Sequence, residues 1–140
     1  MKYRELSIAE RPLVNAFYQL TAYRRPVSGD DRVFVAERGD GVDGAVRIES
    51  REGVQVLRGM YMHPDRMRQG IGSGLLAHIK PILADTESYC IPGAHLLDFY
   101  GQADFRQISF DAAPGFLVER IRGYLDEGKD VVIMHRAAGL

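Results

Sequence analysis

A glycine-rich turn between a strand-like run and a helix-like run restricts the fold of this chain more than any other feature. The run 54–62 ends just before Pro64, and the run 71–83 repeats apolar residues at helical spacing. Gly70, Gly72 and Gly74 stand where that helix begins. Each glycine in a helix costs about 1 kcal/mol relative to alanine. Three of them predict that the backbone comes close to a ligand at this point.

The start of such a helix is suited to a phosphate group. Its first N–H groups lack partners within the helix, and the helix dipole places positive potential there. Arg66 and Arg68 add positive charge in the same loop. A P-loop is excluded because no Lys followed by Ser or Thr comes after the glycines. A dinucleotide fingerprint needs glycine where Leu75 stands, so a nucleotide-binding domain fits less well but remains an alternative.

The segment 60–76 resembles the acyl-CoA site of the GCN5-related N-acetyltransferases (GNAT). That pattern is an apolar strand, a proline, [Q/R]-x-x-G-x-[G/A], and then a helix. The sequence supplies Arg68-Gln69-Gly70-Ile71-Gly72-Ser73, with Met67 in place of the first Gln or Arg.

A second segment, 97–105, resembles the C-terminal FYxxxGF signature of the same family. Phe99 and Tyr100 match it, and Asp104 takes the place of the family's glycine. That position ends a helix and often adopts the left-handed conformation, which Asp tolerates better than most residues. Together the two segments extend the resemblance over roughly residues 32–108.

The resemblance implies an α/β chain with the GNAT fold, in one domain spanning residues 1–140. We expect a mixed, mostly antiparallel central sheet with splayed parallel strands forming an acyl-CoA cleft. The hydrophobic pattern predicts strands at 32–38, 45–50, 54–62, 86–91, 104–108 and 131–134. Gly59 predicts a bulge at the splay. Pro81 should end or kink the helix that follows the glycines.

Further helices are expected after a Ser7–Glu10 capping box, before Asp104, and from about 111 to 128. The last of these should carry an apolar face that includes Phe116, Leu117, Ile121, Tyr124 and Leu125.

The resemblance also implies roles for individual residues. Acetyl-CoA would be the co-substrate, although the acyl group need not always be acetyl. The backbone of Met60, Tyr61 and Met62 would hold the acyl arm. The pyrophosphate would lie on residues 68–73, that is on Arg68, Gln69, Gly70, Ile71, Gly72 and Ser73. Tyr100 would be the general acid, because a tyrosine hydroxyl can donate a proton or hydrogen bond to the departing thiolate.

The general base and the acceptor stay open. The strand 54–62 carries no carboxylate, so Glu87, Glu49 or a water chain remain as bases. Arg24 and Arg25, in the loop expected to wall the acceptor site, are candidates to hold an acceptor carboxylate. The acceptor itself would be an amine of a small molecule or a peptide. Cys90 is expected to be a buried, inert thiol.

Bulk properties exclude several classes of protein. The net charge of −1 favours neither nucleic acid nor a membrane surface. One cysteine excludes an intrachain disulfide, and the histidines are too scattered to suggest a metal site. No signal peptide and no membrane-spanning run is visible, so a cytoplasmic protein is expected. The four scattered histidines are His63, His78, His95 and His135.

The resemblance also implies a possible homodimer, as in many family members.

Two functions from different classes therefore compete. The first is an acetyl-CoA-dependent N-acetyltransferase. The second is a non-catalytic CoA-binding or regulatory module, favoured by Met67 and by the missing carboxylate on the strand 54–62. Retention of Tyr100 favours the enzyme.

Overall fold

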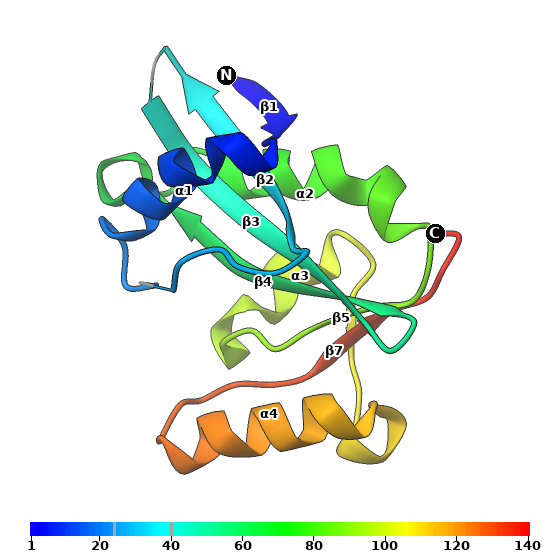
Figure 1. Ribbon diagram of the computed structural model, residues 1–140. Coiled ribbons are helices and arrows are strands. Elements are labelled where there is room, and N and C mark those ends of the chain that lie inside the picture. Colours follow the sequence, from blue (N-terminus) through cyan, green and yellow to red (C-terminus); the bar gives the residue numbers. More distant parts are fainter. Residues whose placement is uncertain (24, 40) are drawn as a thin grey trace.

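The computed structural model describes residues 1–23, 25–39 and 41–140, and within them one seven-stranded sheet forms the centre of the molecule (Figure 1). The strand order is β1-β2-β3-β4-β5-β7-β6. The strands are β1 (Lys2–Glu5), β2 (Arg32–Arg38), β3 (Gly41–Arg51), β4 (Val54–Met62), β5 (Ser88–Cys90), β6 (Arg106–Gln107) and β7 (Met134–Arg136). The helices are α1 (Arg11–Tyr18), α2 (Ile71–Leu83), α3 (Leu97–Gly101) and α4 (Gly115–Asp126). Short 3-10 turns are η1 (Ile8–Glu10), η2 (Pro64–Arg66), η3 (Ala94–Leu96) and η4 (Phe110–Ala112).

The sheet is mixed and mostly antiparallel, which confirms the predicted α/β class. β1 to β4 pair antiparallel in sequence order, and β4 then pairs parallel with β5. α2 connects these two parallel strands, as a parallel crossover requires. β7 lies between β5 and β6 and is antiparallel to both.

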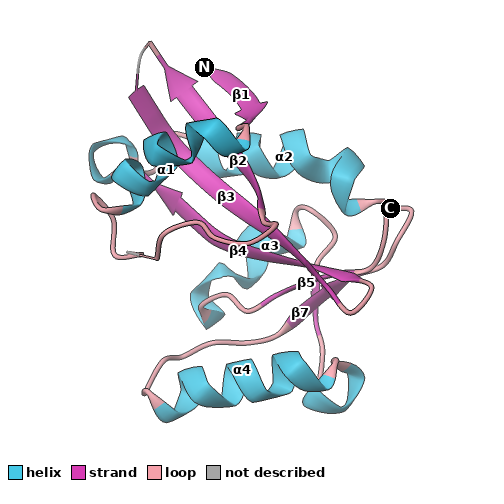
Figure 2. Ribbon diagram, in the orientation of Figure 1, coloured by secondary structure: helices cyan, strands magenta, loops and turns pink. Residues whose placement is uncertain are grey.

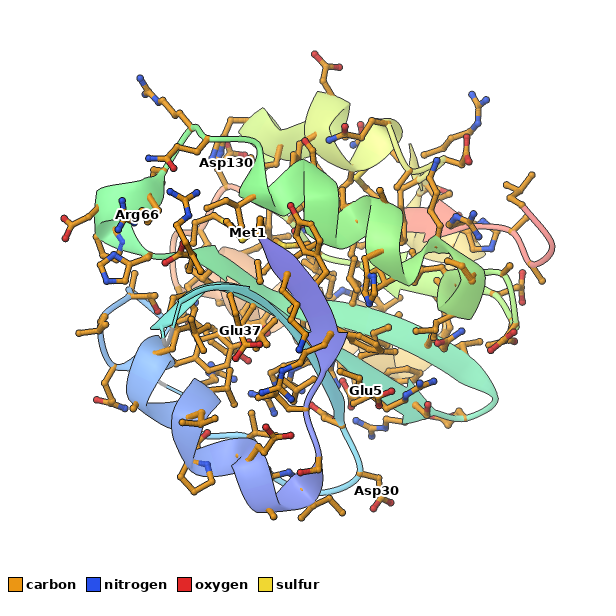
Figure 3. All side chains as sticks on the ribbon, turned by 90° about the horizontal axis from the view of Figure 1, so that it is seen from above. Met1, Glu5, Asp30, Glu37, Arg66 and Asp130 are labelled. Atoms are coloured by element: carbon orange, nitrogen blue, oxygen red, sulfur yellow. The ribbon has the colours of Figure 1, made fainter. Side chains whose placement is uncertain are left out.

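Helices cover both faces of the sheet (Figure 2). Seen from above, α1 and α2 lie on opposite sides of it (Figure 3). Val33, Val35 and Ala45 face α1 and pack with Val14, Phe17 and Tyr18. The opposite face, with Phe34, Ala36 and Val46, packs against α2 and α3. α4 covers the α1 side at β4 and β5, through Leu117 and Ile121 against Val56 and Tyr89.

The structure corrects several element boundaries. Pro81 lies inside α2, which runs on to Leu83 instead of ending there. The strand expected at 131–134 begins at Met134, while Val131 makes one isolated bridge to Gly93. These boundaries depend on neighbouring strands, which no local pattern records. A further correction concerns Leu125, which was expected on the apolar face of α4 and is 41% exposed.

The first strand is fixed to the sheet by a polar cluster. Arg4 donates to Glu37 on β2 and to both carboxylate oxygens of Glu10. Glu10 also accepts the backbone N–H of Ser7 at 3.0 Å, which is the predicted capping box. α1 then starts at Arg11 with Pro12 in its first turn, where proline costs no hydrogen bond.

A bulge in β4 at Gly59 positions the cleft. Ala45 pairs with Tyr61, whereas Arg47 pairs with Arg58, so β4 holds one residue more than β3 between these pairs. Gly59 has φ of +64°, as this predicted bulge requires. The parallel pairing of β4 with β5 ends at Leu57 and Cys90, while β4 continues to Met62. The two strands therefore splay beyond the bulge, as predicted.

Candidate active site

A cleft of about 1110 Å³ opens where β4 and β5 separate. The second half of β4 and the loop 64–70 form one wall, and the start of α2 continues it. Residues of β5, η3, α3 and α4 line the rest, together with residues 20–23, Arg25 and residues 129–131. All the residues predicted to hold the cofactor, from both Met60–Met62 and 68–73, line this cleft, and so does Tyr100. The fold thus brings the two sequence motifs together.

The loop before α2 leaves backbone N–H groups free at the helix start. Arg68 and Gly70 have φ of 63° and 77°, and this pair of left-handed residues turns the chain into the helix. The first α-helical hydrogen bond runs from Gly74 N to Gly70 O at 3.0 Å. The amides of Ile71, Gly72 and Ser73 therefore precede the helical ladder and are available to an anion. Arg66 lies in the same loop (Figure 3).

The three glycines have different structural reasons, which refines the sequence interpretation. A side chain at Gly72 would lie 2.9 Å from Phe99, and one at Gly74 would overlap the ring of Tyr3. Around Gly70 the space is open, and this glycine is required by its positive φ. Gly72 and Gly74 thus let α2 pack closely against α3 and β1, while Gly70 shapes the turn.

The bulge decides which side of the sheet each β4 side chain meets. Met60 and Met62 pack on the α2 side, and Tyr61 packs on the α1 side. Arg58, three residues before Tyr61, also lies on the α1 side, where it donates to Glu49. In a regular strand two residues three apart would face opposite sides. The cleft therefore has an α2 side and an α1/α4 side, joined at the splay.

The bulge is held by a tyrosine that the sequence did not single out. Tyr18 donates its hydroxyl to Gly59 O at 2.8 Å. A side chain at Gly59 would lie 2.9 Å from that hydroxyl, so the fit is close. Burial raises the pKa of Tyr18, which therefore stays a hydrogen-bond donor. The Gly59 carbonyl is occupied, and the extra bulge residue leaves the cross-strand ladder interrupted beside Met60.

Arg47, also buried, fixes the segment that walls the α1 side of the cleft. It pairs with Asp31 at 2.9 Å and donates to Tyr23 Oη at 3.1 Å. Tyr23 stacks on Tyr61, with ring centroids 5.1 Å apart. Arg47 thus holds the stacked pair of Tyr23 and Tyr61 in place on the α1 side of the cleft.

Tyr100 is buried in the cleft wall, with 6% of its surface exposed. Its ring packs edge-on against Phe99 and Phe105. In the described part of the chain its hydroxyl makes no hydrogen bond. Burial raises the pKa of Tyr100, with smaller contributions from Cys90 and Tyr61, so the hydroxyl keeps its proton throughout the neutral range. Asp104 lies in the turn that follows α3 and has φ of 68°, the left-handed conformation predicted for this position. The N–H of Phe105 closes this turn on Tyr100 O at 3.3 Å.

Neither of the carboxylates proposed as general base lines the cleft. Glu87 is exposed and pairs with His135 at 3.0 Å on the sheet beyond it. Glu49 lies behind the wall; burial alone would raise its pKa, but Arg120 and Arg58 lower it, which makes it a poor base. Asp130 is the one carboxylate among the described lining residues, and no motif in the sequence points to it.

Four other residues named from the sequence lie as follows. Cys90 is buried at the splay, and burial raises its pKa well above the usual value, which agrees with an inert thiol. His95, named only among the scattered histidines, lines the cleft beside Gly93. Arg25 lines the cleft, whereas Arg24 lies outside the described residues.

Comparison with known proteins establishes the family and the fold of this chain. The model of the acetyltransferase (GNAT) domain matches residues 29–107, more than half of the chain. The chain therefore belongs to the GNAT family, and its sheet with one parallel pair is the GNAT fold. A search of curated protein sequences returned no match.

Solved structures resemble the whole chain at low sequence identity. The ribosomal-protein-S18-alanine N-acetyltransferase from Escherichia coli superposes with a TM-score of 0.72 at 17% identity, over 99% of this chain and 94% of that one. N-acetylglutamate synthase from Neisseria gonorrhoeae, complexed with coenzyme A and N-acetyl-glutamate, gives 0.70 at 16% identity, over 97% of this chain and 34% of that one. An aminoglycoside 6'-N-acetyltransferase complexed with coenzyme A gives 0.69 at 11% identity, over 98% and 97%. At these identities the likeness shows the fold alone.

Among the described residues, no group of three or more His, Cys, Asp or Glu side chains is arranged to hold a metal ion. No helix in the same residues has the length and apolar character needed to cross a membrane.

Proposed function

We propose that this protein transfers an acetyl group from acetyl-CoA to a primary amine by direct attack of the amine on the thioester. The observation that carries this proposal is the meeting of three features in one cleft: a helix start with free amides, a splayed and bulged strand, and a buried tyrosine. Each one serves a different part of the reaction.

The pyrophosphate of the cofactor would bind at the start of α2. The residues assigned to it are Arg68, Gln69, Gly70, Ile71, Gly72 and Ser73, through backbone N–H groups and the positive end of the helix dipole. Three of those amides precede the first helical hydrogen bond, which supports the assignment.

The acyl arm would lie along the second half of β4, at Met60, Tyr61 and Met62. The bulge interrupts the ladder there, so a backbone N–H is available to polarise the thioester carbonyl.

Tyr100 would serve as the general acid. The amine forms a bond to the carbonyl carbon, the carbon–sulfur bond breaks, and the thiolate takes a hydrogen bond or proton from the Tyr100 hydroxyl. The raised pKa keeps that hydroxyl protonated, and no hydrogen bond within the described residues competes for it. A thiol of ordinary pKa near 8.5 is a stronger acid than this tyrosine. The tyrosine therefore stabilises the departing thiolate by a hydrogen bond, and solvent replaces any proton that the phenol transfers.

The amine must lose a proton, and here water is the proposed acceptor. Asp130 and His95 line the cleft, but neither was predicted to act as base. Among the described residues, no hydrogen bond or ion pair of either side chain directs it towards the splay. With no dedicated base, the enzyme would act best on amines that are already neutral.

The test combines binding and turnover. Acetyl-CoA should raise the melting temperature through binding linkage, and thiol release with a panel of amines should follow. No thermal shift with millimolar acetyl-CoA would refute CoA binding. A clear shift with no thiol release for any amine would favour the second candidate, a non-catalytic CoA-binding module, which the absence of a β4 carboxylate supports.

A further inference from the structure

We propose that the α1/α4 side of the cleft binds a carboxylate of the acceptor through Arg58 and Arg120. The acceptor class would then be a primary amine with a carboxylate close by. This inference rests on the proposed acetyl transfer and adds the chemistry by which the acceptor is recognised.

The two arginines share a single carboxylate. Arg120 of α4 donates to Glu49 Oε1 at 2.8 Å and to Oε2 at 3.2 Å, and Arg58 of β4 donates to Oε1 at 3.2 Å. Both arginines line the cleft, whereas Glu49 does not. One negative charge therefore holds two guanidinium groups in place, and one positive charge is left over beside the cleft. Glu49 acts as the positioning residue.

The surrounding charge is also positive. Arg25 and Lys129 also line the cleft, and Asp130 is the one carboxylate among its described lining residues. Lys129 pairs with Glu127 at 3.1 Å. Counting the carboxylates behind the wall as well, four cations face three anions. The cations are Arg25, Arg58, Arg120 and Lys129, and the anions are Glu49, Glu127 and Asp130.

The distance between the two arginines and the thioester segment of β4 suits an acceptor whose amine and carboxylate are near each other. Arg58 and Tyr61 are three residues apart on β4, at most about 10 Å at the rise of an extended strand. The Arg58 guanidinium also contacts Tyr23 Oη at 3.4 Å, and Tyr23 stacks on Tyr61. A carboxylate on the arginines would thus lie within about 10 Å of the strand segment assigned to the thioester. The planar N–H fork of arginine matches a carboxylate in both charge and shape.

Two sources can supply this chemistry, an amino-acid-like small molecule or the N-terminus of a peptide, and the assay separates them. One arm compares the α-amide of L-glutamate with the α-amide of L-glutamine, and the other compares Gly-Glu-Gly amide with Gly-Gln-Gly amide. Within each pair the amines are closely matched, and one carboxylate is replaced by an amide. The acid should have a kcat/KM roughly 10- to 100-fold above that of its amide partner, as expected for a charge-assisted hydrogen bond. The arm with the larger ratio identifies the source.

Variants connect this preference to the arginines. In Arg120→Met the ratio should fall towards one, whereas Arg122→Met, an exposed arginine on the same helix, should leave it unchanged. Glu49→Gln keeps an oxygen that can accept the arginine N–H groups but removes the negative charge that competes with the acceptor carboxylate, so the ratio should rise. Calorimetric titration of the acidic acceptor into the CoA-bound protein should show the same order of affinities without turnover.

Equal kcat/KM values within both pairs would overturn the inference, as would a preference that Arg120→Met leaves intact. So would turnover confined to amines that lack a carboxylate. Failure of the proposed function would look different, because acetyl-CoA would then neither bind nor release thiol with any amine.

Discussion

At the scale of single residues, Tyr100 tests the chemistry most directly. Its hydroxyl makes no hydrogen bond within the described residues, so Tyr100→Phe removes no structural contact. We expect kcat to fall about 100-fold, the usual effect of losing a proton donor, with acetyl-CoA affinity retained. Tyr89→Phe is the matched control, because Tyr89 is equally buried on β5 but lies outside the cleft. Unchanged turnover, where chemistry limits the rate, would assign thiolate protonation to water.

The direction of the Tyr100 pKa shift has a consequence for pH profiles. Burial raises this pKa above its ordinary value of 10, so the hydroxyl does not ionise as the pH rises to 10. The alkaline limb of kcat should therefore show no loss of rate from the general acid below that pH.

At the scale of elements, the start of α2 allows a test in which stability and binding change in opposite directions. Ser73 is the third residue of α2, and an aspartate there should stabilise the helix by about 0.3–1 kcal/mol through the helix dipole. The same charge should repel the pyrophosphate and weaken coenzyme A binding by about 10-fold or more. Ser73→Asn is the neutral control of matched size. Normal coenzyme A affinity in Ser73→Asp would place the phosphates elsewhere.

The polar cluster between β1, η1 and β2 predicts a pH-dependent stability. The Arg4 guanidinium, followed by the Ser7 backbone N–H, lowers the pKa of Glu10 from 4.5 to about 2. A lowered carboxylate pKa stabilises the fold above pH 4.5, and this contribution is lost as the pH falls towards 2. Glu10→Gln should therefore be less stable than the wild type at pH 7, and the gap should narrow below pH 4.5. Urea midpoints between pH 7 and pH 3 measure it, with the exposed Glu119→Gln as control.

At the scale of the whole molecule, the positive cleft wall without a dedicated base predicts which amines react. Freeing an ε-amine of pKa about 10.4 at pH 7 costs about 4.6 kcal/mol, against about 1 for an α-amine of pKa about 7.8. We expect α-amines to react faster at pH 7, and all rates to rise towards pH 9. The measurement is kcat/KM against pH for matched α- and ε-amine acceptors. A preference for ε-amines at pH 7 that is lost in Asp130→Asn would make Asp130, which lines the cleft, the base.

The sequence predicted the parts of the molecule whose chemistry is local. The strand 54–62, the glycine turn and the Asp104 cap each follow from neighbouring residues, and each is found as expected. Arg120 and Asp130 reach the cleft only because α4 packs beside β4 and β5, and no spacing in the sequence records that contact. The network of Tyr18 with Gly59 was missed for the same reason, since 41 residues separate them.

Because of the single extra residue at Gly59, the alternation of side chains between the two sheet faces is inverted partway along β4. Before it, alternate side chains belong to one sheet face, and after it the assignment is reversed, so Arg58 and Tyr61 lie on the same side of the sheet. If Gly59 were instead paired as an ordinary strand residue, the glycine turn would stay untouched, but every later β4 side chain would change sides. Tyr61 would then lie on the α2 side, and Met60 and Met62 on the α1 side. Loss of the bulge with Gly59 retained is therefore a short route by which a chain of this fold changes the side chains on each side of the cleft while keeping its glycine turn.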